Sequence, residues 1–466
     1  MSALTGKLVL VIGLGESGLA MARWCALRGA RLRVADSRPS PPGLDALRAD
    51  APLAEIVTGD YGAGVLDGVD LVALSPGIDP RVGVAAEAHR RALPITGEMS
   101  LLAQALDELG VRAQSRILAI TGTNGKTTTT ALTAALARAA GIDAVAAGNI
   151  SPAALDVLMQ RLELGAALPA CWVLELSSFQ IETMRALDPE AATVLNVTDD
   201  HLDRYADLGE YAATKAAIFQ GQGVQVLNRD DARVAAMALP GRRVIRFGTS
   251  APASADDYGI AEREGQAWLV RGEQRLIALT DLPLAGRHNA ANALAAFALC
   301  EGGLGIAPQR LIAGLIAFRG LPHRVELVAE RADGVRYYDD SKGTNVGATA
   351  AALDGMDCPV VLIAGGDGKG QDFSPLAAVL TRKARAVLLI GRDARRIEHA
   401  VASCGVPLEH AADLDTAVLR ANALAQAGDA VLLSPACASL DMFRNYAHRA
   451  EVFVAAVRRL PGVTPR

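Results

Sequence analysis

The segment Thr121-Gly-Thr-Asn-Gly-Lys-Thr127 places a lysine and three threonines around two glycines. An apolar run at 116–120 precedes it, and the apolar residues of 132–139 recur at helical spacing after it. A loop between a strand and a helix can present backbone N–H groups to the phosphates of ATP, with Lys126 reaching the β- and γ-phosphates and Thr127 binding Mg²⁺. We therefore predict an ATP-binding phosphate loop, in preference to a solvated glycine turn with a surface lysine.

Acidic residues and a histidine follow two further apolar runs. Glu175 comes directly after the run 172–174, and an acid at a strand end beside a phosphate loop is a natural Mg²⁺ ligand. His201 lies in the acid-rich segment 196–205, where it could ligate a metal, act as a base or hydrogen-bond a substrate. Lys215 lies on an apolar helical segment, where the residues alone indicate only a snorkelling surface lysine.

A glycine-rich loop also occurs near the N-terminus. The pattern Gly13-x-Gly15-x-x-Gly18 follows the apolar run 8–12, and Asp36 lies 18 residues after its last glycine. This is the dinucleotide fingerprint, in which glycines let the backbone approach a diphosphate at a helix N-terminus. The pattern predicts binding of a diphosphate nucleotide. NAD and a purely structural tight turn remain alternatives.

Several later loops carry polar groups suited to ligands. Asn289 and Asn292 share one helical face and could hold an adenine or cap the helix start. The loops 340–345, 365–372 and 434–441 follow apolar runs and offer cationic and hydroxyl groups to an anionic carboxylate. Because no histidine partner for the cysteine of the last loop is readable, we do not predict a thiol nucleophile.

Length and composition limit the class of protein. The chain has 466 residues, which predicts roughly three domains. Its 46 basic and 51 acidic residues give a net charge of −5, so no general attraction to nucleic acid or anionic lipid is expected. No apolar run is long enough to cross a membrane, and the short apolar run 8–15 lacks a secretory basic region. Six scattered cysteines without CxxC spacing indicate reduced thiols, and we expect a cytoplasmic protein.

Strand-like apolar runs alternate with helical segments along the whole chain, which predicts an α/β fold with parallel sheets. We expect three domains: a Rossmann-like domain at 1–97, a central ATPase-type parallel-sheet domain with the phosphate loop at 98–320, and a Rossmann-like domain at 321–466. In the first domain we expect strands at 8–12, 32–35 and 69–74. In the third we expect them at 360–364, 386–390 and 430–433. The segment 248–257 is predicted to be a polar surface loop.

These motifs together resemble the Mur ligase family, which builds the peptide stem of bacterial peptidoglycan. The resemblance covers the whole chain and rests on the spaced motifs TGTNGKT, ELSSFQ, NVTDDHLDRY, HNAANALAA, HR, DDSKGTN and GGDGKGQDF. A narrower resemblance, to the family members that add glutamate, rests on GLGESG, DSRP, LSPGI and SPACASLDMF. In part, the central and C-terminal motifs are shared with folylpolyglutamate synthetases.

The resemblance implies a ligase that adds D-glutamate to UDP-N-acetylmuramoyl-L-alanine through an acyl phosphate, in peptidoglycan precursor synthesis. It implies ATP, two Mg²⁺ ions and an N-carboxylated Lys215 as participants, small-molecule substrates only, and a monomer. The alternatives are the same chemistry with L-glutamate, a folylpolyglutamate-type ligase, an NAD-dependent dehydrogenase, and an inactive sensor of UDP-sugar precursors. Because the three substrates fall on three domains, domain closure should precede the chemistry.

The family motifs assign site roles by position. Catalytic roles fall on Lys126, Glu175, His201 and Lys215. The implied ATP site comprises Gly122, Thr123, Asn124, Gly125, Lys126, Thr127, Thr128, Asn289, Asn292, Arg324, Asp340 and Lys342. The implied precursor site comprises Gly15, Glu16, Ser17, Asp36, Ser37, Arg38, Gly77, Asn149 and His201. The implied glutamate site comprises Thr344, Lys369, Ser439, Leu440 and Tyr446. The implied metal ligands are Thr127, Glu175, His201 and Lys215 as its carbamate.

Overall fold

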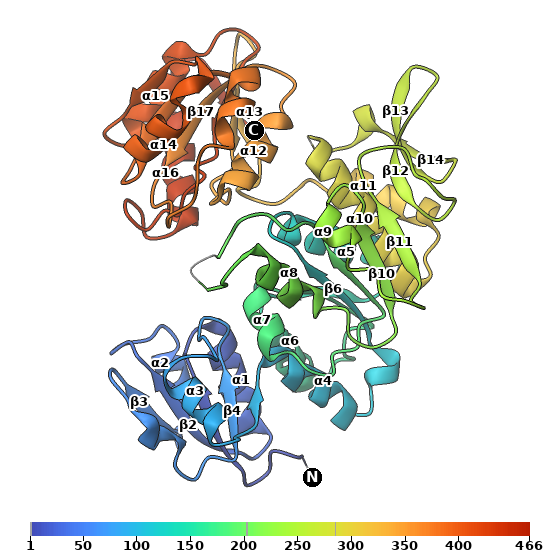
Figure 1. Ribbon diagram of the computed structural model, residues 1–466, viewed down its shortest axis with the longest axis vertical. Coiled ribbons are helices and arrows are strands. Elements are labelled where there is room, and N and C mark those ends of the chain that lie inside the picture. The colour runs from blue at the N-terminus through green and yellow to red at the C-terminus, as the bar shows by residue number, and fades with distance from the viewer. Residues whose placement is uncertain (1, 202–203, 285) are drawn as a thin grey trace.

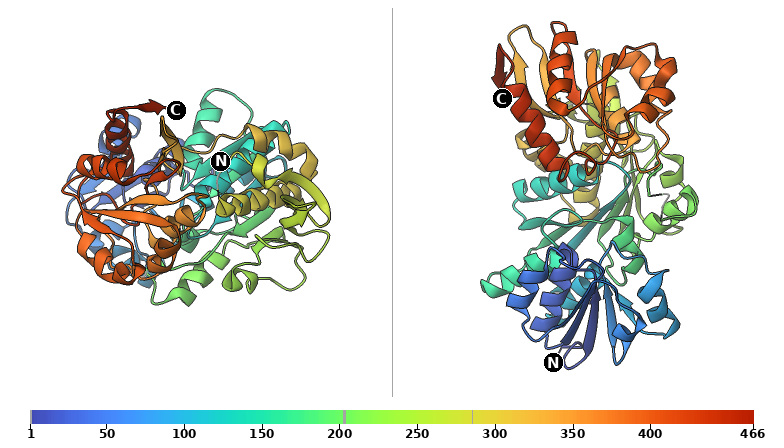
Figure 2. Two further views of the ribbon diagram at one scale, coloured as in Figure 1. Left: turned by 90° about the horizontal axis from the view of Figure 1, so that it is seen from above. Right: turned by 90° about the vertical axis from the view of Figure 1, so that its left-hand side faces the viewer.

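The structure is a computed structural model that describes residues 2–201, 204–284 and 286–466. Three α/β bodies follow one another along the chain and form an elongated molecule (Figures 1 and 2). The N-terminal body lies at one end of the long axis, and the C-terminal body lies at the other end. This arrangement confirms the predicted fold class.

The first domain is a five-stranded parallel sheet in the order β3-β2-β1-β4-β5. Its elements are β1 (Leu8–Ile12), α1 (Glu16–Leu27), β2 (Arg31–Asp36), α2 (Leu44–Asp50), β3 (Glu55–Thr58), β4 (Leu71–Leu74), α3 (Gly83–Arg90) and β5 (Ile95–Thr96). All of β1 is buried because it is a central strand with both faces covered. Strand order reverses between β1 and β4, so a crevice for ligands is expected at their carboxyl ends.

The central domain has a six-stranded parallel sheet in the order β11-β10-β9-β6-β8-β7. Its elements are α4 (Glu98–Glu108), β6 (Arg116–Thr121), α5 (Lys126–Ala139), β7 (Ala144–Gly148), α6 (Ala154–Glu163), β8 (Cys171–Glu175), α7 (Ser178–Thr183), β9 (Ala191–Val194), α8 (Leu208–Ala216), β10 (Val224–Asn228), α9 (Ala232–Ala235), β11 (Val244–Phe247), α10 (Arg287–Leu304) and α11 (Ile312–Ala317). The small residues of α10 let it pack closely on α5.

A second sheet in this domain has no counterpart in the sequence-based prediction. The strands β12 (Tyr258–Arg263), β13 (Gln266–Arg271) and β14 (Gln274–Ala278) form a three-stranded antiparallel sheet that projects at the edge of the domain (Figure 1). The predicted loop 248–257 leads into this sheet and contains no helix or strand.

The third domain is a seven-stranded mixed sheet in the order β19-β18-β17-β20-β16-β15-β21. Its elements are β15 (Glu326–Arg331), β16 (Arg336–Asp339), α12 (Val346–Asp354), β17 (Val360–Gly365), α13 (Leu376–Lys383), β18 (Ala384–Ile390), α14 (Ala394–Val401), β19 (Leu408–His410), α15 (Leu414–Leu424), β20 (Ala430–Leu433), α16 (Tyr446–Arg458) and β21 (Val463–Pro465). Five strands are parallel, as a Rossmann-like domain requires. β15 pairs antiparallel with β16 and with the edge strand β21, and neither β15 nor β21 was predicted.

No helix among the described residues is both long and apolar enough to cross a membrane.

Candidate active site

The phosphate loop joins β6 to α5, as its sequence predicts. Gly122 and Gly125 have φ angles of +152° and +82°, where a side chain would be strained. A Cβ atom at Gly125 would also lie 2.5 Å from an amide oxygen of α10. Lys126 donates hydrogen bonds of 2.8 Å to the carbonyl oxygens of Gly122 and Thr123. The first-turn N–H groups of α5 are available to an anion, because no side chain caps this helix.

This loop forms one wall of a cavity of about 790 Å³ between the central and third domains. Arg324 donates a 2.6 Å hydrogen bond to the hydroxyl oxygen of Thr127. Asn345 donates one of 3.1 Å to the side-chain oxygen of Asn124. The cavity brings together most of the predicted ATP-site residues: Thr123, Asn124, Gly125, Lys126, Thr127, Thr128, Asn289, Asn292, Arg324, Asp340 and Lys342. Gly122, the remaining one, contributes the carbonyl that Lys126 contacts.

Other polar side chains of the central and third domains also line the cavity. Asn292 donates to the side-chain oxygen of Asn289 at 3.2 Å, which confirms that the two amides share a helix face. Lys342 lies 3.9 Å from the ring centre of Tyr446. Burial raises the pKa of Asp340 to about 7, although the hydroxyl of Ser434 donates to it at 2.7 Å.

Glu175 is the last residue of β8 and lines the same cavity. Asn149 donates to its Oε1 atom at 2.7 Å, while no described residue donates to its buried Oε2 atom. A buried carboxylate oxygen without a donor is costly unless a cation accompanies it. Glu175 therefore fits a Mg²⁺ ligand, with the hydroxyl of Thr127 as a second oxygen on the same cavity wall.

Lys215 is buried rather than solvated, with a residue exposure of 1%. It donates a 3.0 Å hydrogen bond to the carbonyl of Gly122, which Lys126 also contacts, and lies 4.4 Å from the ring centre of Tyr211. Burial, together with the charge of Lys126, lowers the pKa of Lys215 well below its usual value. A neutral amine at this position can react with CO₂, so its surroundings fit a carbamate.

His201 lies on the loop between β9 and α8 and does not line the cavity. Its Nε2 atom is 3.6 Å from the Asp200 carboxylate, and its ring packs edge-on at 4.7 Å from Phe179. Its φ angle of +55° is uncommon for a residue other than glycine. Lys215 also lies outside the cavity lining. The motif residues Leu202 and Asp203 lie outside the described part of the chain.

The predicted precursor residues form a separate group in the first domain. Asp36 is buried and accepts a 2.7 Å hydrogen bond from the backbone N–H of Leu14. Arg38 donates to both oxygens of Asp36, and this pairing holds the pKa of the carboxyl at about 2. Gly15, Glu16, Ser17, Asp36, Ser37, Arg38 and Gly77 do not line the cavity. Only Asn149 does, and the neighbouring Ser151 donates to Glu16 at 2.7 Å.

The predicted glutamate residues divide between two places. Thr344 and Tyr446 line the cavity, whereas Lys369, Ser439 and Leu440 do not. The loops that carry the last three are joined by two backbone hydrogen bonds between Asp367 and Ala438, of 3.0 and 2.8 Å. Leu440 is 72% exposed, so it contributes to no enclosed pocket here.

Three site residues were not singled out from the sequence. Asn196 clamps the phosphate loop, because its side chain accepts from the N–H of Asn124 at 2.8 Å and donates to its carbonyl at 3.1 Å. Asn345 joins the loop to the third domain. Both lie in the quoted motifs NVTDDHLDRY and DDSKGTN, and membership of those motifs was the available signal. Arg449 is fully buried and donates to both Ser341 and Cys437. Nothing in its helical sequence distinguishes it from a surface arginine.

Comparisons with known proteins agree with this geometry. The family description "Mur ligase MurD-like, N-terminal domain" matches residues 7–97, "Mur ligase middle domain" matches 120–300, and "Mur ligase, glutamate ligase domain" matches 323–437. The chain is 83% identical over 463 residues to the UDP-N-acetylmuramoylalanine–D-glutamate ligase of Aromatoleum aromaticum, covering 99% of each chain. It is 56% identical to the ligase of the same name from Dechloromonas aromatica, covering 98% of this chain and 99% of that one.

Solved structures agree on the fold. The UDP-N-acetylmuramate–alanine ligase of Thermotoga maritima has a TM-score of 0.59 at 19% identity, covering 97% of this chain and 99% of that one. The folylpolyglutamate synthase of Mycobacterium tuberculosis has a TM-score of 0.55 at 17% identity, covering 76% and 94%. With its three matched domains and its high identity to relatives along nearly its whole length, the chain belongs to the Mur ligase family.

Proposed function

We propose that this ligase joins D-glutamate to the L-alanyl carboxylate of UDP-N-acetylmuramoyl-L-alanine and converts ATP to ADP and phosphate. The observation that carries the proposal is the cavity in which the phosphate loop faces Arg324 and Lys342 of the third domain. A ligase that activates a carboxylate must bring two anions together, and this cavity gathers cationic groups from two domains for that purpose. Relatives with 83% and 56% identity are named for this substrate pair.

The reaction needs activation because amide formation from a carboxylate and an amine is unfavourable in water. An oxygen of the L-alanyl carboxylate attacks the γ-phosphorus of ATP, and the bond from that phosphorus to the β–γ bridging oxygen breaks. This gives ADP and an acyl phosphate. The glutamate amine then attacks the acyl carbon and loses a proton, and inorganic phosphate leaves.

The chain contributes charge and position to these steps. The first-turn N–H groups of α5 and the ammonium of Lys126 offset the charge of the triphosphate once Lys126 turns from the loop carbonyls toward it. Arg324 lies beside Thr127 and adds a second cation from the third domain. When bound, Mg²⁺ supplies positive charge to the phosphoryl oxygens. Thr127 and Glu175 would hold one ion, and His201 with carboxylated Lys215 would serve a second.

We also propose the remaining assignments. The loop residues near Asp36 and Arg38 hold the UDP precursor, Asn289 and Asn292 hold the adenine end of ATP, and the loops of the third domain hold glutamate. The first domain then spans 1–97, the central domain 98–320 and the third 321–466. The protein acts as a cytoplasmic monomer on small molecules.

A ligase assay tests the proposal. Purified protein is given ATP, Mg²⁺ and UDP-N-acetylmuramoyl-L-alanine, with D-glutamate, L-glutamate, D-aspartate or L-lysine offered in parallel. ADP and a new amide should form with D-glutamate and depend on both substrates. Formation of neither product with any of the four amino acids would refute the proposed chemistry, and preference for L-glutamate would refute the stereochemical assignment.

A further inference from the structure

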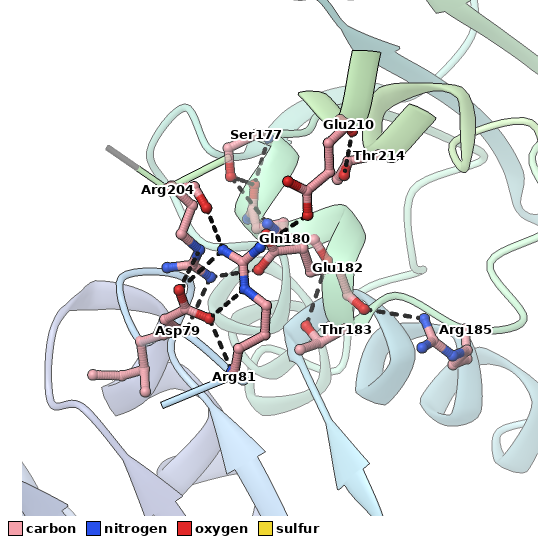
Figure 3. A network of polar contacts seen from close by, with 11 residues as sticks. Asp79, Arg81, Ser177, Gln180, Glu182, Thr183, Arg185, Arg204, Glu210 and Thr214 are labelled. Carbon is pink, nitrogen blue, oxygen red and sulfur yellow. Dashed lines mark hydrogen bonds and ion pairs between the residues drawn. The ribbon is translucent and has the colours of Figure 1, made fainter. Parts of the chain in front are cut away.

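Two arginines cross between the first and central domains in opposite directions (Figure 3). Arg81 lies in the first domain, where both oxygens of Asp79 hold its guanidinium at 2.9 and 3.0 Å. From there it donates a 2.9 Å hydrogen bond to Glu210 on α8 and another hydrogen bond to the backbone carbonyl of Arg204. Glu210 is further fixed by the backbone N–H of Ala206, which donates to it at 2.7 Å.

Arg204 reaches back in the other direction. It donates to the backbone carbonyl of Ile78 in the first domain at 3.2 Å, and its Nε atom lies 3.5 Å from Asp79. It also pairs with Glu182 on α7 and lies 4.6 Å above the ring of Phe179. Its side chain is only 8% exposed, so this cation is largely removed from water at the domain junction.

We call Asp79, Arg81, Glu182, Arg204 and Glu210 the arginine clasp. All members except Glu182 are within five residues of a proposed site group. Ile78, which Arg204 contacts, follows the precursor loop residue Gly77. Arg204 lies three residues after His201, and Glu210 lies five residues before Lys215 on α8.

The clasp does not belong to the nucleotide site. None of its five residues lines the cavity between the central and third domains. Its fixed charges are two guanidinium groups and three carboxylates, and each guanidinium contacts carboxylates on more than one element. Such a network fixes the relative position of the elements it joins, because planar guanidinium groups bind carboxylates in a defined geometry.

We propose that Arg81 and Arg204 are positioning residues that set the precursor in the first domain against the reacting groups of the central domain. The inference rests on the proposed function, in which the precursor carboxylate must approach the γ-phosphate of ATP. Misplacement of reacting groups by about 1 Å can slow a reaction roughly 100-fold. Neither arginine touches substrate in this account, since each acts through the loop and helices it holds.

Arg81→Ala is the decisive variant because Arg81 is 43% exposed and its removal leaves no buried charge unpaired. We expect kcat/KM for UDP-N-acetylmuramoyl-L-alanine to fall roughly 10- to 100-fold. KM for ATP should stay within about twofold of wild type, because the phosphate loop is untouched. Arg81→Lys keeps the charge without the planar fork, so it should recover part of the loss. Glu210→Gln should move kcat/KM in the same direction by a smaller factor.

The matched control is Arg91→Ala. Arg91 is 36% exposed and pairs with Glu87 and Asp67 at 2.9 Å, but both partners belong to its own domain. This variant should match wild type in both substrate constants. Thermal unfolding of all variants is recorded, and Arg81→Ala should unfold close to the wild-type temperature because exposed ion pairs contribute little to stability.

The outcomes separate the two proposals. If wild-type protein forms no amide, the proposed function fails. If wild type is active and Arg81→Ala keeps the wild-type kcat/KM for the precursor, the positioning role fails. The role also fails if Arg81→Ala raises KM for ATP and KM for the precursor by the same factor, or if Arg81→Lys recovers none of the lost activity. In either case a general structural defect would explain the loss. Arg204→Lys is a secondary variant only. Arg204 and its partner Glu182 are largely buried, so a loss of activity in this variant does not separate misplacement from misfolding.

Discussion

Replacement of Glu98 by glutamine tests how a buried acid at the first domain junction sets the pH dependence of stability. Glu98 begins α4 directly after Gly97 and is buried. Its Oε1 atom accepts hydrogen bonds from the N–H groups of Ala154 and Leu155, at 2.6 and 3.4 Å, so it caps α6. The Ser17 side chain also lies near this carboxyl and favours its ionised form, although no described residue donates a hydrogen bond to the Oε2 atom. Burial raises the pKa of this carboxyl from 4.5 to about 7.

The magnitude follows from this pKa shift. The folded chain holds the carboxyl proton more tightly than the unfolded chain, so stability is lost as pH rises above the unfolded pKa. The loss stops growing once pH exceeds the folded pKa. Between pH 5 and pH 8, linkage predicts that this group alone lowers the free energy of unfolding by roughly 2 to 3 kcal/mol. Glutamine can keep the oxygen that accepts from α6 but cannot ionise, so Glu98→Gln should remove this contribution.

Denaturant unfolding at pH 5, 6, 7 and 8 measures the effect. Tryptophan fluorescence follows the transition, since Trp24 and Trp172 are buried in the cluster that joins the first and central domains. The difference in unfolding free energy between Glu98→Gln and wild type should grow in favour of the variant by roughly 2 to 3 kcal/mol from pH 5 to pH 8. Glu108→Gln, on the same helix, is the control: the pKa of Glu108 is lowered, so its contribution changes only at acid pH. Parallel pH profiles for Glu98→Gln and wild type would refute the reasoning.

Three further predictions concern the site. Lys215→Ala should lose roughly 100-fold or more in ligase activity, with partial recovery in high chloride or a short carboxylate; full activity without additive would exclude the carbamate. Gly125→Ala should weaken nucleotide binding roughly tenfold or more, because αL strain of about 1–2 kcal/mol adds to a 2.5 Å contact with α10. Gly141→Ala is the control, because a side chain there is strained at φ +91° but meets no atom within 4 Å. Equal nucleotide affinities of the two variants, measured by calorimetry, would contradict the proposed fit of the phosphate loop. Small-angle scattering should show compaction with ATP and precursor; identical profiles would contradict domain closure.

Local chemistry and the α/β class with parallel sheets were readable from the sequence. The phosphate loop and Glu175 follow apolar runs of one parallel sheet, and the carboxyl ends of such strands meet at one edge. The antiparallel sheet β12-β13-β14 was missed because its first turn, Glu264-Gly265, lacks the Asn-Gly or Asp-Gly pair that marks two-residue hairpins in a sequence, although both residues have the positive φ of such turns. β3 was missed because none of its four residues is buried, which leaves a weak apolar signal.

The placement of one sheet against another could not be predicted. Arg324 and Asn345 contact the phosphate loop across a domain boundary. No periodicity in either segment indicates that the two domains come so close. For the same reason the motifs assign Lys369 and Ser439 to one glutamate site with Tyr446, while in the structure only Tyr446 of these three lines the cavity. Lys215 shows the opposite case. The sequence suggested a solvated lysine, whereas helix packing buries it and lowers its pKa.

The two domain junctions differ in the atoms they use. Arg324 and Asn345 of the third domain contact the side-chain oxygens of Thr127 and Asn124. Both phosphate-loop residues belong to the proposed nucleotide site. A triphosphate with its cation must therefore replace at least the bond from Arg324 to Thr127, so this junction is sensitive to ligand. The arginine clasp uses no residue of that cavity. Nucleotide can thus replace a contact of the third domain without replacing any contact of the clasp, so closure and precursor alignment can be tested by separate variants.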